Sequence, residues 1–60
     1  MKTIIIDFKD KNQIIISNVY EIKFEFEDLI IRNFLDGDQS KKTTRIYQLD
    51  IDSMKIEFNY

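Results

Sequence analysis

The sequence predicts an all-β protein, a small antiparallel meander of six strands. The first observation is the stretch Tyr20–Phe26, in which apolar and charged side chains alternate strictly, as they do along a half-buried strand. The second is Ser53–Tyr60, which repeats this alternation. The third is the composition, which holds twelve Ile, five Phe and three Tyr but no Ala and no Pro. This bias is typical of strands rather than helices.

The length of 60 residues allows one domain, covering residues 1–60. A chain this short buries only about 60% of the surface that its unfolded form exposes, so its stability as a monomer is marginal. A single flat sheet also cannot bury its apolar face alone. We therefore expect the sheet to close into a barrel-like structure or to pack face to face with a second copy as a homodimer.

Short polar or turn-forming segments separate the expected strands. The run around Ile30 is ambiguous, because a helix over residues 28–36 that ends at Gly37 also explains its apolar pattern. Its short length and its β-rich surroundings favour a strand. The expected strands are Lys2–Phe8, Gln13–Ser17, Tyr20–Phe26, Leu29–Leu35, Thr43–Leu49 and Ser53–Tyr60.

Matching the apolar faces of neighbouring strands predicts two hairpin registers. A three-residue turn that ends at Asn12, in the left-handed conformation, sets Ile6 opposite Ile16. A tight turn without Gly sets Phe26 opposite Leu29. In both hairpins the apolar rows then coincide, which supports the registers.

The alternation assigns one apolar row of each strand to the core and leaves several large apolar side chains on the opposite face. Two interpretations stay open: a strongly twisted sheet buries parts of both faces, or the second face binds a second copy or another protein, since contiguous exposed apolar patches are unusual on monomers. The predicted core comprises Ile4, Ile6, Phe8, Ile14, Ile16, Tyr20, Ile22, Phe24, Phe26, Leu29, Ile31, Tyr47, Leu49, Met54, Ile56 and Phe58. The candidate partner surface comprises Ile5, Ile15, Glu21, Lys23, Glu25, Ile30, Phe34 and Ile46.

The side chains that carry most enzyme chemistry are missing. With no His and no Cys there is no imidazole base, no thiolate nucleophile and no Cys/His zinc site. Asp36 and Asp38 have calcium-loop spacing, but the third acidic ligand and the distal Glu are absent. Glu25 and Glu27 share a strand face, although so short a chain can hardly frame a cleft around them. We expect no catalytic residue, no cofactor and no metal site, and therefore no enzyme.

Eleven acidic and nine basic side chains give a net charge of −2. Basic residues cluster only at Lys41, Lys42 and Arg45, so electrostatic attraction to nucleic acid or to an anionic membrane is disfavoured. The start of the chain lacks the long apolar core of a signal peptide, and its longest apolar run is three residues. We expect a soluble, cytoplasmic protein without membrane attachment.

The segment from Tyr47 to Ile56 alternates apolar and polar residues around a turn at Asp50 and Asp52. In this pattern it resembles many small proteins of phages, prophages and low-GC Gram-positive bacteria. The resemblance implies an accessory or inhibitory role, encoded by a phage, prophage or plasmid, against a host protein.

The sequence favours a non-enzymatic protein–protein interaction module that forms a homodimer or binds another protein. One alternative is a small β-barrel that binds single-stranded nucleic acid, with Tyr20, Tyr47 and Tyr60 as stacking platforms. The other is a structural subunit of a homo-oligomer.

Overall fold

A computed structural model of the chain describes residues 1–35 and 40–58. It confirms an all-β fold, with one five-stranded antiparallel sheet in the order β4-β3-β2-β1-β5. The prediction of six strands is wrong, because the second and third expected strands form one continuous strand. The elements are β1 (Lys2–Phe8), β2 (Gln13–Glu25), β3 (Asp28–Phe34), β4 (Lys41–Tyr47), the 3₁₀ helix η1 (Gln48–Asp50) and β5 (Ile51–Phe58).

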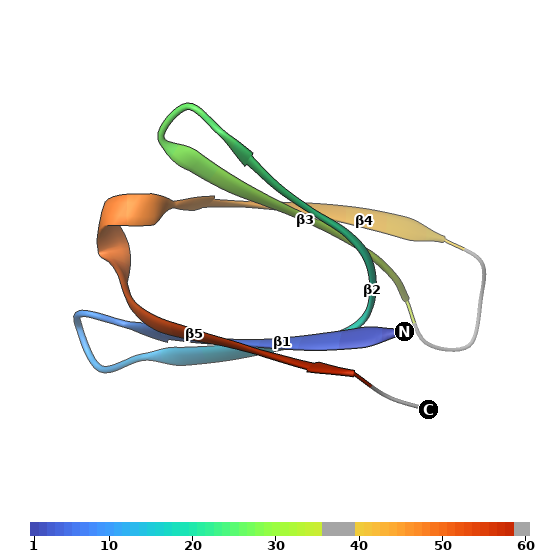
Figure 1. The fold of residues 1–60 in the computed structure, drawn as a ribbon, viewed down its shortest axis with the longest axis horizontal. Helices are drawn as coiled ribbons and strands as arrows, with labels where there is room; N and C mark the ends of the chain where they lie inside the picture. The colour runs from blue at the N-terminus through green and yellow to red at the C-terminus, as the bar shows by residue number, and fades with distance from the viewer. Residues whose placement is uncertain (36–39, 59–60) are drawn as a thin grey trace.

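The long strand β2 bends in its middle and folds the sheet into two layers (Figure 1). Asn18 lies at the bend with a φ of 57°, a left-handed conformation that Asn tolerates better than most residues. Residues before the bend pair with β1, and residues after Val19 pair with β3. One layer therefore holds β1, β5 and the first half of β2, and the other holds β3, β4 and the second half of β2.

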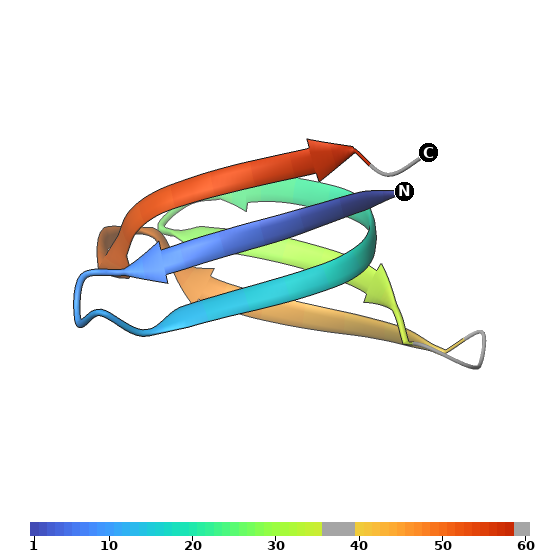
Figure 2. The same cartoon turned by 90° about the horizontal axis from the view of Figure 1, so that it is seen from below.

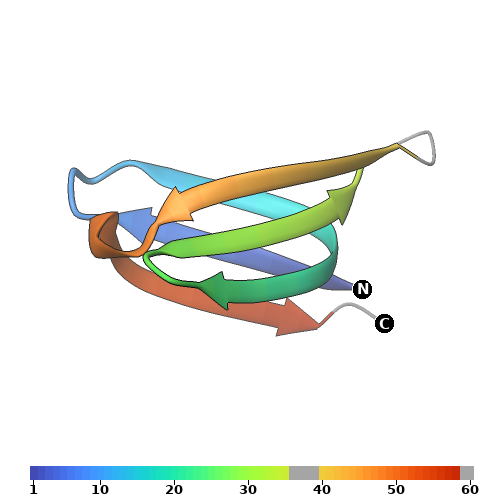
Figure 3. The same ribbon diagram turned by 90° about the horizontal axis from the view of Figure 1, so that it is seen from above.

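The two layers are stacked strand over strand. Views from opposite sides agree that β5 lies over the second half of β2, β1 over β3, and the first half of β2 over β4 (Figures 2 and 3). β4 and β5 are the edges of the sheet, and η1 connects them without any strand pairing between them. The sheet is therefore folded on itself but not closed into a barrel.

The β1–β2 hairpin has a longer loop than the sequence predicts. Ile6 lies opposite Ile14 rather than Ile16. The loop is closed by a hydrogen bond from the Phe8 N–H to the carbonyl of Asn12, and Lys11 rather than Asn12 takes the positive φ, at 77°. The error is two residues, so every side chain still lies on the predicted face.

The β2–β3 hairpin differs from its predicted register by the same amount. Phe24 rather than Phe26 lies opposite Leu29, because Phe26 stands in the turn with a φ of 56°. The first residue of η1 supports this turn, since the Gln48 side chain donates hydrogen bonds of 3.1 Å to the carbonyls of Phe26 and Asp28. The helix alternative for residues 28–36 is wrong for the described part of that range, which is strand β3 through Phe34.

The last two strands both begin two residues earlier than expected. Lys41 already starts β4, and Gln48–Asp50 form η1 where the sequence predicts a strand end and a turn. Ile51 starts β5 and packs partly buried against the core. The predicted polar loop with Asp36 and Asp38 lies outside the described residues.

The core lies between the layers. Its buried members are Ile4, Ile6, Val19, Leu29, Ile31 and Ile46, against which Phe8, Ile14, Ile16, Ile22 and Ile51 pack.

Eight residues of the predicted core are exposed instead: Tyr20, Phe24, Phe26, Tyr47, Leu49, Met54, Ile56 and Phe58. Tyr20 is the extra residue of a bulge between Val19 and Glu21, which turns its side chain to the outer face. Val19 takes the inner position in its place.

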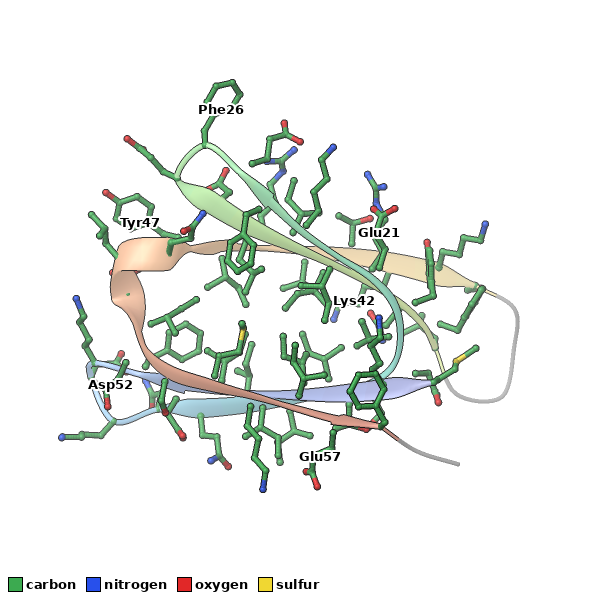
Figure 4. All side chains as sticks on the ribbon, in the orientation of Figure 1. Glu21, Phe26, Lys42, Tyr47, Asp52 and Glu57 are labelled. Carbon is green, nitrogen blue, oxygen red and sulfur yellow. The ribbon has the colours of Figure 1, made fainter. Side chains whose placement is uncertain are left out.

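Ile46 lies on the inner face because it pairs with Leu29. This pairing sends the neighbouring Tyr47 outward (Figure 4).

Candidate interaction site

Three ion pairs cover the outer face of the layer formed by β3, β4 and the second half of β2. Arg32 contacts Glu21 at 2.6 Å, Lys23 contacts Glu25 at 3.1 Å, and Arg45 contacts Asp28 at 3.2 Å. Acidic and basic side chains are paired on this face, so most of its charges are neutralised within the chain.

Ile30 lies beneath these charged side chains and is only 2% exposed. It stands between its cross-strand neighbours Lys23 and Arg45, and long charged side chains cover apolar surface with their methylene stems. Ile46 is also buried, on the inner face. Both residues were candidates for the partner surface, and burial within the single chain removes them from it.

Phe34 belongs to an aromatic cluster at the end of the same outer face. Its ring lies 4.7 Å from the ring of Tyr20, and the Lys41 Nζ lies 5.8 Å from that Tyr20 ring. These contacts within the chain already occupy much of the surface that Phe34 was expected to offer.

Ile5 and Ile15 lie on the other layer, where they pair directly across β1 and β2. Ile5 is half-buried and Ile15 is 61% exposed. The two outer faces point in opposite directions (Figure 1). The structure therefore divides the eight candidate residues between two faces and the interior, and does not bring them together into one site.

A different apolar surface lies along one open side of the folded sheet, where β5 and the second half of β2 are stacked. Met54, Ile56 and Phe58 pair with Ile6, Ile4 and Lys2 and so lie on the inner, core-facing side of β5.

All three nevertheless remain accessible, because β5 is an edge strand. Phe58 is 64% exposed, with the Lys2 Nζ 5.9 Å from its ring. Phe24, on the inner face of the layer above, is 60% exposed. We call Phe24, Met54, Ile56 and Phe58 the open-side cluster.

Sequence reasoning placed this cluster in the core and missed that it is uncovered. The alternation of β5 predicts its inner row correctly, but exposure depends on which strands become edges. That depends on the long-range pairing of β5 with β1, for which the sequence offers no local signal. Phe26 is also missed as a surface residue; it is 97% exposed and points away from the tip of the β2–β3 hairpin (Figure 4).

A hollow of about 690 Å³ lies where the β1–β2 loop meets η1. Its lining includes two carboxylates, Asp10 and Asp50. Asp10 uses both its oxygens to accept 3.0 Å hydrogen bonds from the backbone and side chain of Asn12, which is ordinary turn chemistry. The Asp50 carbonyl accepts a bond from the Lys9 N–H and anchors η1 to the loop. These bonds explain the Asp10 carboxylate and the Asp50 backbone carbonyl by loop structure.

The pKa of the Glu25 carboxyl departs clearly from its ordinary value. A hydrogen bond from Lys23, and then the charge of the same lysine, lower the pKa of its carboxyl. Within residues 1–35 and 40–58 no group of three or more acidic side chains is placed to hold a metal ion. In the same ranges no helix is long and apolar enough to span a membrane.

Comparisons with family models, with curated proteins and with solved structures found no match for this chain.

Proposed function

We propose that this protein is a non-enzymatic interaction module that binds another polypeptide through its open-side cluster. The observation that carries the proposal is the exposure of Phe24 and Phe58, at 60% and 64%, on faces that otherwise form the core. Large exposed apolar patches are rare on monomeric proteins and mark interaction sites.

Two further features support a polypeptide as the ligand. Among the described residues, the open side carries backbone edges from both layers, since β5 ends the sheet and the residues of β2 after Val19 pair only with β3. An extended peptide adds to such an edge through main-chain hydrogen bonds, and apolar pockets beside the edge then give specificity. The absence of His and Cys supports a role without imidazole or thiolate catalysis.

A photo-crosslinking phenylalanine analogue tests the proposal. It is placed at Phe24, at Phe58 or at Ile15 in separate full-length proteins, which are irradiated in extract of the source cells. Ile15 is the matched control, because it is similarly exposed but lies on an outer face. We expect covalent adducts with a polypeptide from Phe24 and Phe58 and none from Ile15.

The same crosslinking from the Phe24 position, in a protein that also carries Phe58→Ser, shows whether the Phe58 ring is needed for binding. If only the Ile15 position formed adducts, we would conclude that the binding site lies on the outer face. The absence of any polypeptide adduct from the two open-side positions would contradict the proposal.

A further inference from the structure

The outer edge of β5 is unusually well suited to pairing with another strand. On its far side from β1 it has no strand partner in the sheet that the structure describes. Natural proteins protect such edges with Pro, bulges, inward-pointing charges or charged side chains along the edge, Lys above all. The irregularity of β5 lies only at its start, near Ile51, and Met54–Phe58 runs on in regular register with an inner row that is entirely apolar.

The outer row of the same segment carries charges of opposite sign in a particular order. Lys55 and Glu57 stand on either side of Ile56 and point to the outer face, since they pair with Ile5 and Thr3. Glu57 is directed away from the space between the layers (Figure 4). Both side chains are exposed, and neither takes part in the ion pairs found among the described residues.

This order makes the strand complementary to itself. When two copies of a strand pair antiparallel about a two-fold axis, one residue lies opposite its own copy. If that residue is Ile56, Lys55 lies opposite the partner's Glu57, and the symmetric pair forms at the same time. Cross-strand pairs of opposite charge stabilise a sheet by roughly 0.2–1 kcal/mol each.

The neighbouring registers lack this complementarity. A pair centred on Lys55 sets two lysines opposite one another, and a pair centred on Glu57 sets two glutamates opposite one another. Like charges directly opposite in a sheet are destabilising. The charge order therefore selects the register centred on Ile56.

The same register also joins the exposed apolar rows. Met54 lies opposite the partner's Phe58 on the inner face, and Ile56 meets the partner's Ile56. The second half of β2, which carries the exposed Phe24 on its inner face, lies over β5 in the other layer (Figures 2 and 3). Association in this register covers the open-side cluster of both copies.

We infer that two copies of this chain associate through β5, antiparallel and in the register centred on Ile56, so that their sheets become one continuous sheet. The inference rests on the proposed function and names a second copy as the polypeptide that the open side binds.

Two charge reversals test it in the full chain. Lys55→Glu and Glu57→Lys each convert both cross-strand pairs from opposite to like charge, and both positions are exposed, so circular dichroism is expected to show an intact fold. Sedimentation over a concentration series at low salt is expected to show a wild-type dimer. Each single variant is expected to raise the dimer dissociation constant by about tenfold or more.

Mixing the two single variants is the decisive experiment. In the mixed dimer a lysine again faces a carboxylate at both pairs, so the two variants are expected to prefer one another. Native mass spectrometry, with one variant isotopically labelled, measures this as a heterodimer in excess of the statistical half. The double variant Lys55→Glu/Glu57→Lys restores both pairs within one chain and is expected to dimerise like the wild type.

Three results would overturn the inference: a wild-type protein that stays monomeric at high micromolar concentration, single variants that dimerise as well as the wild type, or a mixture with no heterodimer preference. The crosslinking experiment tests the proposed function separately. A monomeric wild type that still crosslinks a different polypeptide from Phe58 keeps the interaction module and removes only self-association. A protein that forms neither an adduct nor a dimer would contradict both the proposed function and the self-association.

Discussion

The side-chain amide of Asn33 donates a hydrogen bond of 3.2 Å to the backbone carbonyl of Ser17 and so ties β3 to the bend of β2. Asn33 is buried on the inner face, where its backbone pairs with Val19. Ser17 directly precedes Asn18, whose positive φ turns the strand. One buried side chain thus secures the point at which the sheet folds into two layers.

Replacing Asn33 is expected to weaken the whole fold. Asn33→Ala leaves the Ser17 carbonyl without this donor, and the loss of a buried hydrogen bond costs about 1–3 kcal/mol of the free energy of unfolding. Urea denaturation measures the change. The matched control is Asn12→Ala, because Asn12 is exposed in the β1–β2 loop; it is expected to change stability by no more than about 0.5 kcal/mol. Equal losses in the two variants would show that the contact at the bend has no special role.

Phe26 is expected to be a destabilising residue. A bulky side chain in the left-handed conformation costs about 1–2 kcal/mol, and Phe26 regains little by burial, since it is almost fully exposed. Asn tolerates this conformation and is common in tight hairpin turns. Phe26→Asn is therefore expected to raise the free energy of unfolding by about 1 kcal/mol, measured by the midpoint of urea denaturation.

The neighbouring Glu27 provides the control for Phe26, because it is exposed in the same turn without a positive φ. Glu27→Asn is expected to leave the midpoint nearly unchanged. A stabilisation that is equal in both variants would point to a general effect of Asn in the turn. A loss of stability in Phe26→Asn would mean that the aromatic ring supports the turn despite its exposure.

The sequence predicts the faces of the strands better than their registers. Both hairpins are displaced by two residues, and a shift of two leaves every side chain on its face, so matching apolar rows cannot detect it. The true loops depend on positive φ angles at Lys11 and Phe26. Neither residue type favours that conformation, so the local sequence gives no reason to place the turns there.

The candidate site was harder to predict because it depends on tertiary context. The bulge at Tyr20 reverses one side chain without any Gly to mark it. Ile30 is buried between its cross-strand neighbours Lys23 and Arg45, which come from two other strands. The open-side cluster is exposed only because β5 returns to pair with β1 and ends the sheet there. No local pattern contains this information.

Two of the outer-face isoleucines, Ile30 and Ile15, are expected to respond very differently to truncation. Ile30→Ala removes a side chain that is 2% exposed and is expected to cost about 2–4 kcal/mol of the free energy of unfolding. Ile15→Ala truncates a residue that is 61% exposed and is expected to cost no more than about 0.5 kcal/mol. Thermal or urea denaturation of both variants measures the difference. A small loss for Ile30→Ala would return this residue to the list of candidate surface residues.

Single-stranded nucleic acid is expected not to bind. The net charge is −2, and three cations of one outer face, Lys23, Arg32 and Arg45, each contact a carboxylate within the chain. Nucleic-acid binding draws most of its free energy from unneutralised Lys and Arg that meet phosphates. Fluorescence anisotropy of a labelled oligonucleotide at low salt measures it. Binding that weakens steeply as salt is added would revive the stacking-platform hypothesis.

The ion pair between Lys23 and Glu25 is expected to leave a clear signature in pH titration. The hydrogen bond from Lys23, followed by its charge, lowers the pKa of the Glu25 carboxyl in the folded protein. A lowered folded-state pKa stabilises the fold above the unfolded-state pKa, and this contribution is lost as the pH falls through the folded-state value. Because the pair is exposed, the effect on stability is small, and the carboxyl carbon shift in NMR is the better readout.

Lys23→Gln is expected to return the pKa of Glu25 close to its ordinary value, because it removes both of the largest causes. Arg45→Gln is the control, since the charge of Arg45 acts on the same carboxyl more weakly; it is expected to raise the pKa by less. A larger rise in Arg45→Gln than in Lys23→Gln would show that the charge distribution over this outer face, rather than the single hydrogen bond, sets the titration of Glu25.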